Sequence, residues 1–272
     1  MNETNKHIIE LMNSYGIDIS QFDTTFLNKS IQKRMNETLC TTKKQFYKLL
    51  KENKVEAGTL LESLHINYSE FFRNPLTFAV LEHLILPSIA INKKHLKSKE
   101  IRIWSAACAD GQEAYSLAML LEELNAVNGD KIKYRIFATD QSQKQVSEAK
   151  KGIYTAEGLN NLGLKRVKQW FNKNDDNYSI KDELKAHIDF SVFDLLSEQL
   201  NCPSPSIFGD FDIVICANLL FYYKPIFRKA ILEKTGGCRA KGGYLICGET
   251  ERDIFMQQNF CEVYPHSGIF KK

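Results

Sequence analysis

The chain has 272 residues and a mass of 31.3 kDa, enough for one large α/β domain or for a medium domain with a small one. Apolar residues at 43% and charged residues at 25% exclude a wholly disordered or fibrous protein. The formal net charge of +3 is too small to imply nucleic acid or an anionic membrane as an obligate partner. The seven cysteines show no CxxC spacing, so we interpret them as reduced thiols without a disulfide framework or a metal cluster.

We expect no targeting segment at the N-terminus. Residues 1–10 are mainly polar and charged where a signal peptide needs an apolar run, so we predict a cytoplasmic protein. Apolar runs such as residues 213–223 are shorter than the roughly 20 residues that span a bilayer, so we predict no membrane span.

Up to about residue 69, the chain is predicted to form short helices. Apolar residues recur at helical spacing within residues 8–12, 46–50 and 60–64, and no stretch alternates like a strand. Thr41 and Thr42 precede a run of helix formers and are expected to cap a helix, whereas Gly58 is expected to break one. These features predict a small helical bundle.

From about residue 100, strand and helix patterns alternate. The expected strands are residues 101–107, 134–140, 188–194, 211–221 and 242–251, and the expected helices are residues 112–124, 142–150 and 225–236. This order predicts a mostly parallel sheet with helices on both faces. The polar stretch at residues 172–187 is either a loop or a small hairpin insertion.

Candidate ligand residues follow the expected strands, because ligands of such sheets bind at the carboxyl ends of the strands. Residues 106–113 form a run of mostly small residues that opens directly into a helix, which is typical of a loop that binds a ligand. The GxGxxG fingerprint is absent, and a tight connection without a ligand is the alternative. Asp140 follows the second strand and could accept hydrogen bonds from ribose hydroxyls or cap the next helix. Asp194 and Leu195 follow the third strand, where they could contact an adenine or form another cap.

Residues 218–223 follow the buried fourth strand. Methyltransferases that act on amino groups often carry two prolines here, but Leu219 and Leu220 stand at those positions, so a nitrogen acceptor is disfavoured. Tyr222 and Tyr223 could equally be packing residues. Residues 67–75 form an unexplained aromatic cluster that includes Arg73 and either joins two domains or carries function.

Together, five ordered motifs between Asn67 and Glu251 resemble the chemotaxis receptor glutamate methyltransferases of the CheR type. Residues 67–75 resemble N-x-T-x-F-F-R-x-P, with Ser69 in place of threonine. Residues 104–119 resemble W-S-A-x-C-x-x-G-E-E-x-Y-S-L-A-M, with Gln112 in place of the first glutamate. The third motif is A-T-D with a later G-I-Y, which residues 138–140 and 152–154 match. Residues 216–223 resemble the fourth motif, C-R-N-x-L-I-Y-F, and residues 242–251 resemble the fifth, G-G-Y-L-x-x-G-x-x-E.

The resemblance implies an α/β fold in which a small all-helical domain precedes a Rossmann-like S-adenosylmethionine domain. We expect a helical substrate-recognition domain over residues 1–72 and the methyltransferase domain over residues 73–272, with a possible small insertion near residues 172–187. The resemblance implies no metal, and it makes Arg73 and Tyr222 the catalytic residues closest to the reacting groups. The implied contacts to S-adenosylmethionine, or to the product S-adenosylhomocysteine, are Asn67, Ser69, Arg73, Gln112, Asp140, Asp194, Leu195, Asn218 and Leu219.

Three departures from the family pattern bear on the expected cofactor site. Gln112 retains hydrogen-bonding capacity but loses a charge, which could lower cofactor affinity. Asp194 stands where the family often has asparagine, and Ala217 replaces an arginine beside the cofactor loop. We therefore expect an intact but slightly altered active site.

The implied reaction is in-line transfer of a methyl group to a glutamate carboxylate of a cytoplasmic chemoreceptor helix, in chemotaxis adaptation. A glutamate with a pKa of about 4.3 is already ionised at pH 7, so no general base is required. None of the six histidines falls on a strand-end motif. Arg73 is expected to orient the carboxylate, and Tyr222 either to hold its second oxygen or to fix Arg73. Action on another carboxylate, or a regulatory protein that has lost catalysis, remain alternatives.

Substrate recognition is assigned to the N-terminal region. Lys29, Lys33 and Arg34 lie on one side of a predicted helix over residues 26–37, a spacing suited to acidic residues of a receptor bundle, although a solvated helix face is the alternative. Many relatives tether a receptor C-terminal peptide with a glycine-containing loop in a small β insertion. Because residues 172–187 contain no glycine, we predict no such tether. Nucleic acid is the least expected substrate.

Overall fold

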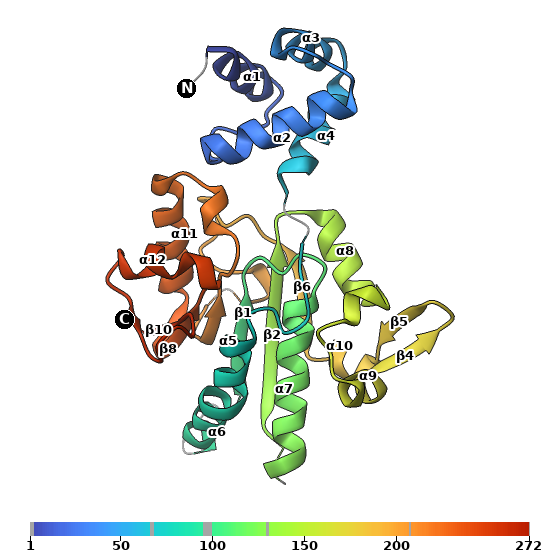
Figure 1. The fold of residues 1–272 in the computed structure, drawn as a ribbon. Coiled ribbons are helices and arrows are strands. Elements are labelled where there is room, and N and C mark those ends of the chain that lie inside the picture. The colour runs from blue at the N-terminus through green and yellow to red at the C-terminus, as the bar shows by residue number, and fades with distance from the viewer. Residues whose placement is uncertain (1–2, 66–67, 95–99, 129–130, 207, 272) are drawn as a thin grey trace. The chain divides into compact units, whose positions relative to one another are not determined.

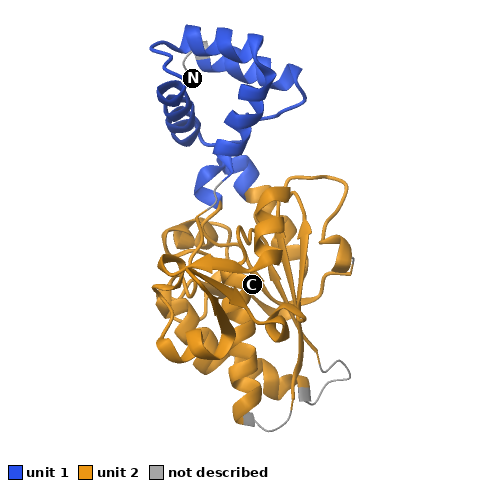
Figure 2. Cartoon of the chain, turned by 90° about the vertical axis from the view of Figure 1, so that its right-hand side faces the viewer, with its two compact units in different colours: residues 1–66, 220–228 blue, residues 67–219, 229–272 orange. Residues whose placement is uncertain are grey.

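The computed structural model describes the chain except for residues 1–2, 66–67, 95–99, 129–130, 207 and 272. It divides into two compact units (Figure 2): unit 1 comprises residues 1–66 and 220–228, and unit 2 comprises residues 67–219 and 229–272. We expected the boundary between residues 72 and 73, but Phe71 and Phe72 are buried in the core of unit 2, so that unit starts earlier. Unit 1 also includes a segment that the sequence analysis assigned to the second domain.

The described part of residues 1–66 is mainly helical, as the periodicity predicts, and forms α1 (Glu3–Ser14), α2 (Thr24–Glu37), α3 (Lys43–Glu52) and α4 (Lys54–Leu64). Thr42 caps α3, accepting the Gln45 N–H at 3.2 Å, as expected. Gly58 lies inside α4, so the expected break there is wrong. The break falls at Asn53, which ends α3 and caps α4 by accepting the Val55 N–H at 3.0 Å.

Residues 220–228 complete unit 1. They comprise the short helix η4 (Leu220–Tyr222) and the first residues of α11 (Pro225–Gly237). The Asp23 N–H donates to the Tyr222 carbonyl at 2.7 Å, and the rings of Phe22 and Tyr223 stack with centroids 5.3 Å apart. The segment is therefore held by both backbone and aromatic contacts within this unit.

Unit 2 is built on a seven-stranded sheet (Figure 1). Five strands run parallel, and two short strands continue the sheet in antiparallel fashion. In spatial order the strands are β6 (Ile188–Val192), β2 (Lys133–Asp140), β1 (Glu100–Ser105), β7 (Phe211–Ile215), β8 (Arg239–Ile246), β10 (Ile269–Lys271) and β9 (Cys261–Glu262). The strand order reverses at β1, which lies between β2 and β7, and such a reversal opens a ligand crevice at the carboxyl ends of the strands.

Helices connect the strands of unit 2. The longer ones are α7 (Gln112–Asn128), which packs on β2, α8 (Gln143–Lys151), which packs on β2 and β6, and the remainder of α11. The shorter ones are η2 (Glu157–Leu159), α9 (Leu164–Trp170), α10 (Asp182–Lys185), η3 (Ser204–Ser206), η5 (Glu249–Glu251) and α12 (Arg252–Met256). Most of these elements lie along the chain between two parallel strands of the sheet, whereas η5 and α12 lie between β8 and β9.

A longer helical segment precedes β1 and consists of α5 (Pro75–Val80), η1 (Leu81–Ile85) and α6 (Leu86–Lys94). The turn η1 is π-helical and lies just before Pro87, which lacks an N–H and clashes with regular helix geometry. We expected no membrane-length segment, but among the described residues Pro75–Lys93 is long and apolar enough to span a bilayer. Core helices pass the same test, and Phe78, Leu81 and Ile85 of this segment are buried in the core of unit 2.

The polar stretch at residues 172–187 belongs to a second, three-stranded sheet. Strands β4 (Phe171–Asn174) and β5 (Asn177–Ile180) form a hairpin, and β5 also pairs with β3 (Ile153–Thr155). Asp175 takes a positive φ of 51° in the two-residue turn. Of the two alternatives, a hairpin is therefore the one found.

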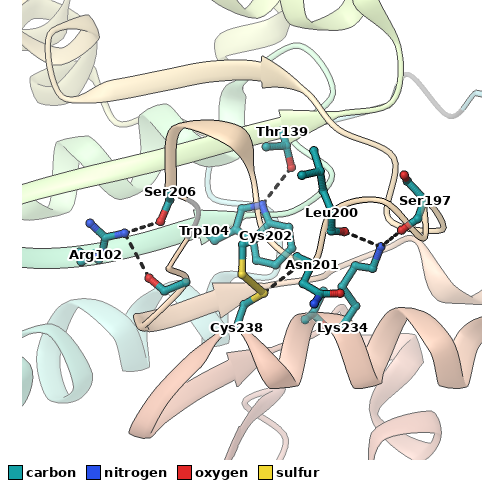
Figure 3. The surroundings of a disulfide bond; sticks show 12 residues. Arg102, Trp104, Thr139, Ser197, Leu200, Asn201, Cys202, Ser206, Lys234 and Cys238 are labelled. Atoms are coloured by element: carbon teal, nitrogen blue, oxygen red, sulfur yellow. Dashed lines mark hydrogen bonds between the residues drawn. A yellow bond between two sulfur atoms is a disulfide. The ribbon is translucent and has the colours of Figure 1, made fainter.

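The expectation that every cysteine is a free thiol is wrong. Cys202 and Cys238 form a disulfide in unit 2 (Figure 3), with Cα atoms 6.3 Å apart, and the other five cysteines are free. The two cysteines are 36 positions apart in the sequence, with β7 and α11 between them, so only the folded topology brings them together. The same loop is held by Lys234, whose ammonium donates to the Leu200 carbonyl at 3.0 Å.

Candidate active site

The loop after β1 lies between the carboxyl ends of its two neighbouring strands. The Ala106 N–H donates to the Ile215 carbonyl of β7 at 2.8 Å, and the Cys108 N–H donates to the Thr139 carbonyl of β2 at 2.8 Å. Ala109 and Gly111 have φ angles of 45° and 92°. The first is strained for a residue with a Cβ, and strain of this kind gathers at functional sites. The loop is thus a shaped part of the crevice and not a plain connection.

Asp140 ends β2 and shapes two loops at once. One carboxylate oxygen accepts the Ala109 N–H at 3.0 Å, and the other accepts the Ser142 N–H at 2.9 Å, just before α8. The side chain is buried. Ser142 is the N-cap of α8, so Asp140 supports the turn before the helix and is not its cap, and the ribose role of Asp140 stays a prediction.

Two buried acceptors at the start of α7 have no partner among the described residues. They are Oε1 of Gln112 and Oδ1 of Asp110. Gln112 is only 4% exposed, and its Nε2 makes a long 3.5 Å bond to the Gly158 carbonyl. Burial also raises the pKa of Asp110 to about 6. Native proteins seldom leave buried acceptors unpaired, so this pair indicates where a ligand donates hydrogen bonds.

Glu113 is a site residue that the sequence analysis did not single out. Its carboxylate accepts the Ser105 hydroxyl at 2.6 Å, at the end of β1. Burial raises the pKa of Glu113 from 4.5 to about 7, and the negative charge of Glu251 adds to this rise. The hydrogen bond from Ser105 and the positive charge of Arg73 lower the pKa and offset part of the rise. Acidic groups and one arginine therefore share this end of unit 2.

The junction segment is attached to α7. The Phe72 N–H donates to the buried Ser116 hydroxyl at 3.0 Å, and Phe72 itself has a strained φ of 52°. Arg73 is half-buried, donates to the Tyr68 carbonyl at 3.2 Å, and lies over the Tyr68 ring at 5.1 Å. Ser69 lies in the same extended stretch and is half-buried, whereas Asn67 is outside the described residues.

The loop after β7 carries Asn218 and Leu219, both half-buried. Asn218 has a left-handed φ of 59°. The carboxylate of Glu251 accepts the N–H groups of both residues, at 2.6 Å and 2.7 Å. The two predicted cofactor residues are thus held by a residue to which the sequence analysis gave no role.

Asp194 and Leu195 follow β6. The Asp194 carboxylate accepts the Leu196 N–H at 2.8 Å within a local turn. No helix begins there, because the next helical element among the described residues is η3 at Ser204, so the helix cap expected as an alternative is not found. Asp194 is exposed and Leu195 is buried. All described residues expected to contact the cofactor therefore belong to unit 2 and follow its strand ends or the junction.

The two expected catalytic residues belong to different units. Arg73 is in unit 2, whereas Tyr222 is in unit 1, where its ring lies 4.7 Å from that of Phe26. Within unit 1, Tyr222 has the packing role that the sequence left open.

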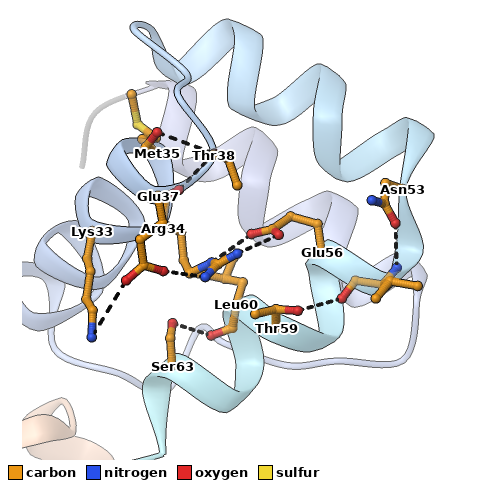
Figure 4. A network of polar contacts seen from close by, with 11 residues as sticks. Lys33, Arg34, Met35, Glu37, Thr38, Asn53, Glu56, Thr59, Leu60 and Ser63 are labelled. Atoms are coloured by element: carbon orange, nitrogen blue, oxygen red, sulfur yellow. Dashed lines mark hydrogen bonds and ion pairs between the residues drawn. The ribbon is translucent and has the colours of Figure 1, made fainter.

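The basic residues of α2 differ in their surroundings (Figure 4). Lys29 is exposed, and Lys33 is exposed with Glu37 at 4.0 Å. Arg34 instead forms a bidentate ion pair with the buried Glu56, at 2.6 Å and 2.8 Å, and also contacts Glu37. Its guanidinium is therefore engaged inside the bundle, which corrects the expectation of a surface charge.

The described residues contain no group of three or more histidine, cysteine or acidic side chains arranged to hold a metal ion. A parallel sheet with a strand-order reversal, a small-residue loop and an acidic residue after β2 defines a Rossmann-like nucleotide-cofactor enzyme. Residues 67–266 match the family model of the CheR methyltransferase, SAM binding domain.

Relatives with known names agree with that match. The chain is 27% identical over 92% of its length to a chemotaxis protein methyltransferase of Borreliella burgdorferi, covering 87% of that protein. It is 32% identical over 74% of its length to chemotaxis protein methyltransferase 1 of Pseudomonas aeruginosa, and the match covers 70% of that protein. It is 33% identical over 78% of its length to a chemotaxis protein methyltransferase of Vibrio anguillarum, and the match covers 74% of that protein. The chain therefore belongs to the CheR methyltransferase family.

Membership confirms the expected fold and activity: a Rossmann-like domain preceded by helices, and a protein-glutamate O-methyltransferase of chemotaxis that uses S-adenosylmethionine. The site suits this cofactor, because its ammonium and hydroxyl groups are donors for the unpaired acceptors of Gln112 and Asp110. Its positive charge also suits the acidic surroundings of Glu113. A chemoreceptor is the substrate class that the family implies.

Proposed function

We propose that this enzyme esterifies glutamate side chains on the cytoplasmic helices of chemoreceptors, as part of chemotaxis adaptation in the cytoplasm. The observation that supports this best is the bond from the Phe72 N–H to Ser116, which joins the junction segment to the helix that begins with Gln112. It keeps Arg73 close enough to influence Glu113 at the cofactor loop. In this proposal, Arg73 orients the substrate carboxylate and the methyl donor binds at the same edge of the sheet.

The bound cofactor supplies the electrophilic methyl group, and the protein supplies position. A substrate glutamate is ionised at neutral pH, so no base is needed. Arg73 presents a planar guanidinium that matches a carboxylate, while its contact with the Tyr68 carbonyl limits how tightly it pairs with substrate. Holding the reactants in line contributes about 7 to 11 kcal/mol to catalysis in well-oriented systems. In this proposal Ser69, Asp140, Asp194, Leu195, Asn218 and Leu219 hold the cofactor.

Tyr222 is the second residue for which we propose a catalytic role. Its ring packs on Phe26, and its carbonyl accepts the Asp23 N–H at 2.7 Å, so its backbone is fixed within unit 1. A phenol held in this way can donate to the second carboxylate oxygen of the substrate. Tyr222→Phe tests this, because it keeps the packing and removes only the hydroxyl; an unchanged rate of methyl transfer would refute the role.

We propose that Lys29 and Lys33 of α2 meet acidic residues of the receptor bundle. Both are exposed, in contrast to Arg34, which is paired with Glu56. Reversing both charges to glutamate should raise the KM for receptor and leave the affinity for S-adenosylhomocysteine unchanged. Lys48→Glu on α3 is the matched control, since its side chain is also exposed and lies near a glutamate.

We further propose that this enzyme neither tethers a receptor C-terminal peptide, nor binds nucleic acid, nor inserts into the membrane. Support for the first point is the two-residue turn between β4 and β5, which contains Asp175 and Asp176 and no glycine. Removing the C-terminal peptide of the receptor should leave the rate of methylation unchanged, and a marked decrease would refute the prediction.

The substrate assignment is tested with a purified cytoplasmic receptor fragment and labelled S-adenosylmethionine. Replacement of the fragment's candidate glutamates by glutamine should abolish labelling, because an amide oxygen is a poor nucleophile at neutral pH. Persistent labelling of the glutamine fragment would favour a different acceptor.

A further inference from the structure

We propose that Glu251, together with Gly248, is a positioning residue for the cofactor loop at Asn218 and Leu219. This inference rests on the proposed role of those two residues in cofactor binding. Glu251 is fully buried and lies about 30 residues further along the chain, after β8. It belongs to the last sequence motif, which the catalytic proposal does not use.

The contacts of Glu251 converge on two backbone turns. One carboxylate oxygen accepts the N–H groups of Asn218 at 2.6 Å and Gly248 at 3.0 Å, and the other accepts the Leu219 N–H at 2.7 Å. A carboxylate is a pure acceptor and can satisfy all three donors at once. It therefore joins the end of β7 to the end of β8 at the active-site edge of the sheet.

Gly248 makes this arrangement possible by its lack of a side chain. A Cβ at this position would lie 2.6 Å from Oδ1 of Asn218 and 2.9 Å from its backbone nitrogen. The φ of Gly248 is −69°, so the need for glycine comes from this close approach and not from the backbone angle. Gly248 and Glu251 thus both contact Asn218, Gly248 by its close approach and Glu251 by a hydrogen bond.

Asn218 needs such support because it holds a left-handed conformation, with a φ of 59°. The Asn218 and Leu219 N–H groups have their acceptor in Glu251, and without it they would lose the bonds that fix the turn. Since Glu251 acts through this backbone, its loss should weaken cofactor binding more than the chemical step at saturating cofactor.

The test compares Glu251→Gln with Glu249→Gln in the full chain. Glu249 is exposed and two residues away, so the same chemical change there is the matched control. In Glu251→Gln, an NH2 group replaces one oxygen and faces backbone donors. We expect at least a roughly tenfold loss of affinity for S-adenosylhomocysteine by calorimetry, the size expected for losing a charge-assisted bond. The KM for S-adenosylmethionine should rise by a similar factor with little change in kcat.

Gly248→Ala is the second variant and decides the question if Glu251→Gln fails to fold, as judged by circular dichroism. It should also weaken binding of S-adenosylhomocysteine, because the new methyl group must displace Asn218. Wild-type affinity and KM in a folded Glu251→Gln protein, or in Gly248→Ala when that variant alone folds, would overturn the inference. Asn218→Ala separates the two levels: if it weakens binding and Glu251→Gln does not, only the positioning role is wrong. If none of the variants changes affinity, the proposed cofactor role of the loop fails as well.

Discussion

Glu113→Gln should change how the stability of the enzyme depends on pH. Burial raises the pKa of this carboxyl from 4.5 to about 7, so the folded protein holds the proton more tightly than the unfolded chain does. The contribution of Glu113 to stability is therefore present below pH 4.5 and is lost as pH rises towards about 7. At about 1.36 kcal/mol per pKa unit, this difference corresponds to up to about 3 kcal/mol.

The free energy of unfolding is measured by urea denaturation without cofactor, at about pH 5 and about pH 8. Between these values the wild type should lose up to about 3 kcal/mol more than Glu113→Gln. The glutamine retains an acceptor for the Ser105 hydroxyl, so packing and hydrogen bonding are largely kept. Glu249→Gln, an exposed position, should follow the wild type. Equal pH dependence in Glu113→Gln and the wild type would refute the reasoning.

Three further changes give distinct outcomes. Asp140→Ala should lower the affinity for S-adenosylmethionine by about tenfold or more in calorimetry, because an anchored acceptor is lost. Arg73→Ala should lower the rate of methyl transfer by about tenfold or more, with the free energy of unfolding changed by less than about 1 kcal/mol. Glu56→Gln should lower the free energy of unfolding in urea by about 2 kcal/mol, because Arg34 loses its bidentate partner inside unit 1.

Each of these results has a contrary outcome. Unchanged cofactor affinity in Asp140→Ala would remove its assignment to the ribose. An unaltered rate in Arg73→Ala would make the junction motif purely structural. Wild-type stability in Glu56→Gln would mean that the ion pair of Arg34 with Glu56 contributes little to the stability of unit 1.

The positions of the central strands of unit 2 along the chain were predictable because these strands are largely buried. The runs that became β1, β2 and β7 are rich in isoleucine, valine and aromatic residues, and turn residues follow them. The final expected strand, residues 242–251, ends instead at Ile246, since Gly248 and Glu251 form a turn. The three-residue strand β3 pairs with distant residues, and no local pattern marks it.

In unit 1, local sequence patterns predicted that helices form more reliably than they predicted where each helix begins and ends. The capping residue Thr42 was found because its spacing to Gln45 is a local signal. The break predicted at Gly58 was wrong because a packed helix tolerates a glycine, and the helix break lies at Asn53 instead. The pairing of Arg34 with Glu56 joins α2 to α4, which no helical spacing within α2 reveals.

In the candidate site too, local sequence signals identified some residues, whereas only the folded structure identified others. Asp140 and Gln112 were found because they follow strand ends and match a family motif. Glu251 was not assigned a role, because its function lies in bonds to backbone groups about 30 residues away. The disulfide of Cys202 with Cys238 was missed because the two cysteines meet only through the folded loop after β6.

The most direct test of the account is transfer of radiolabelled methyl groups from S-adenosylmethionine to membranes that contain chemoreceptors, followed by alkaline treatment. A glutamate methyl ester is labile to base, so label on receptor bands that alkali releases is the predicted result. No transfer from a protein that binds the cofactor tightly in calorimetry would contradict the account and indicate another substrate or a loss of catalysis.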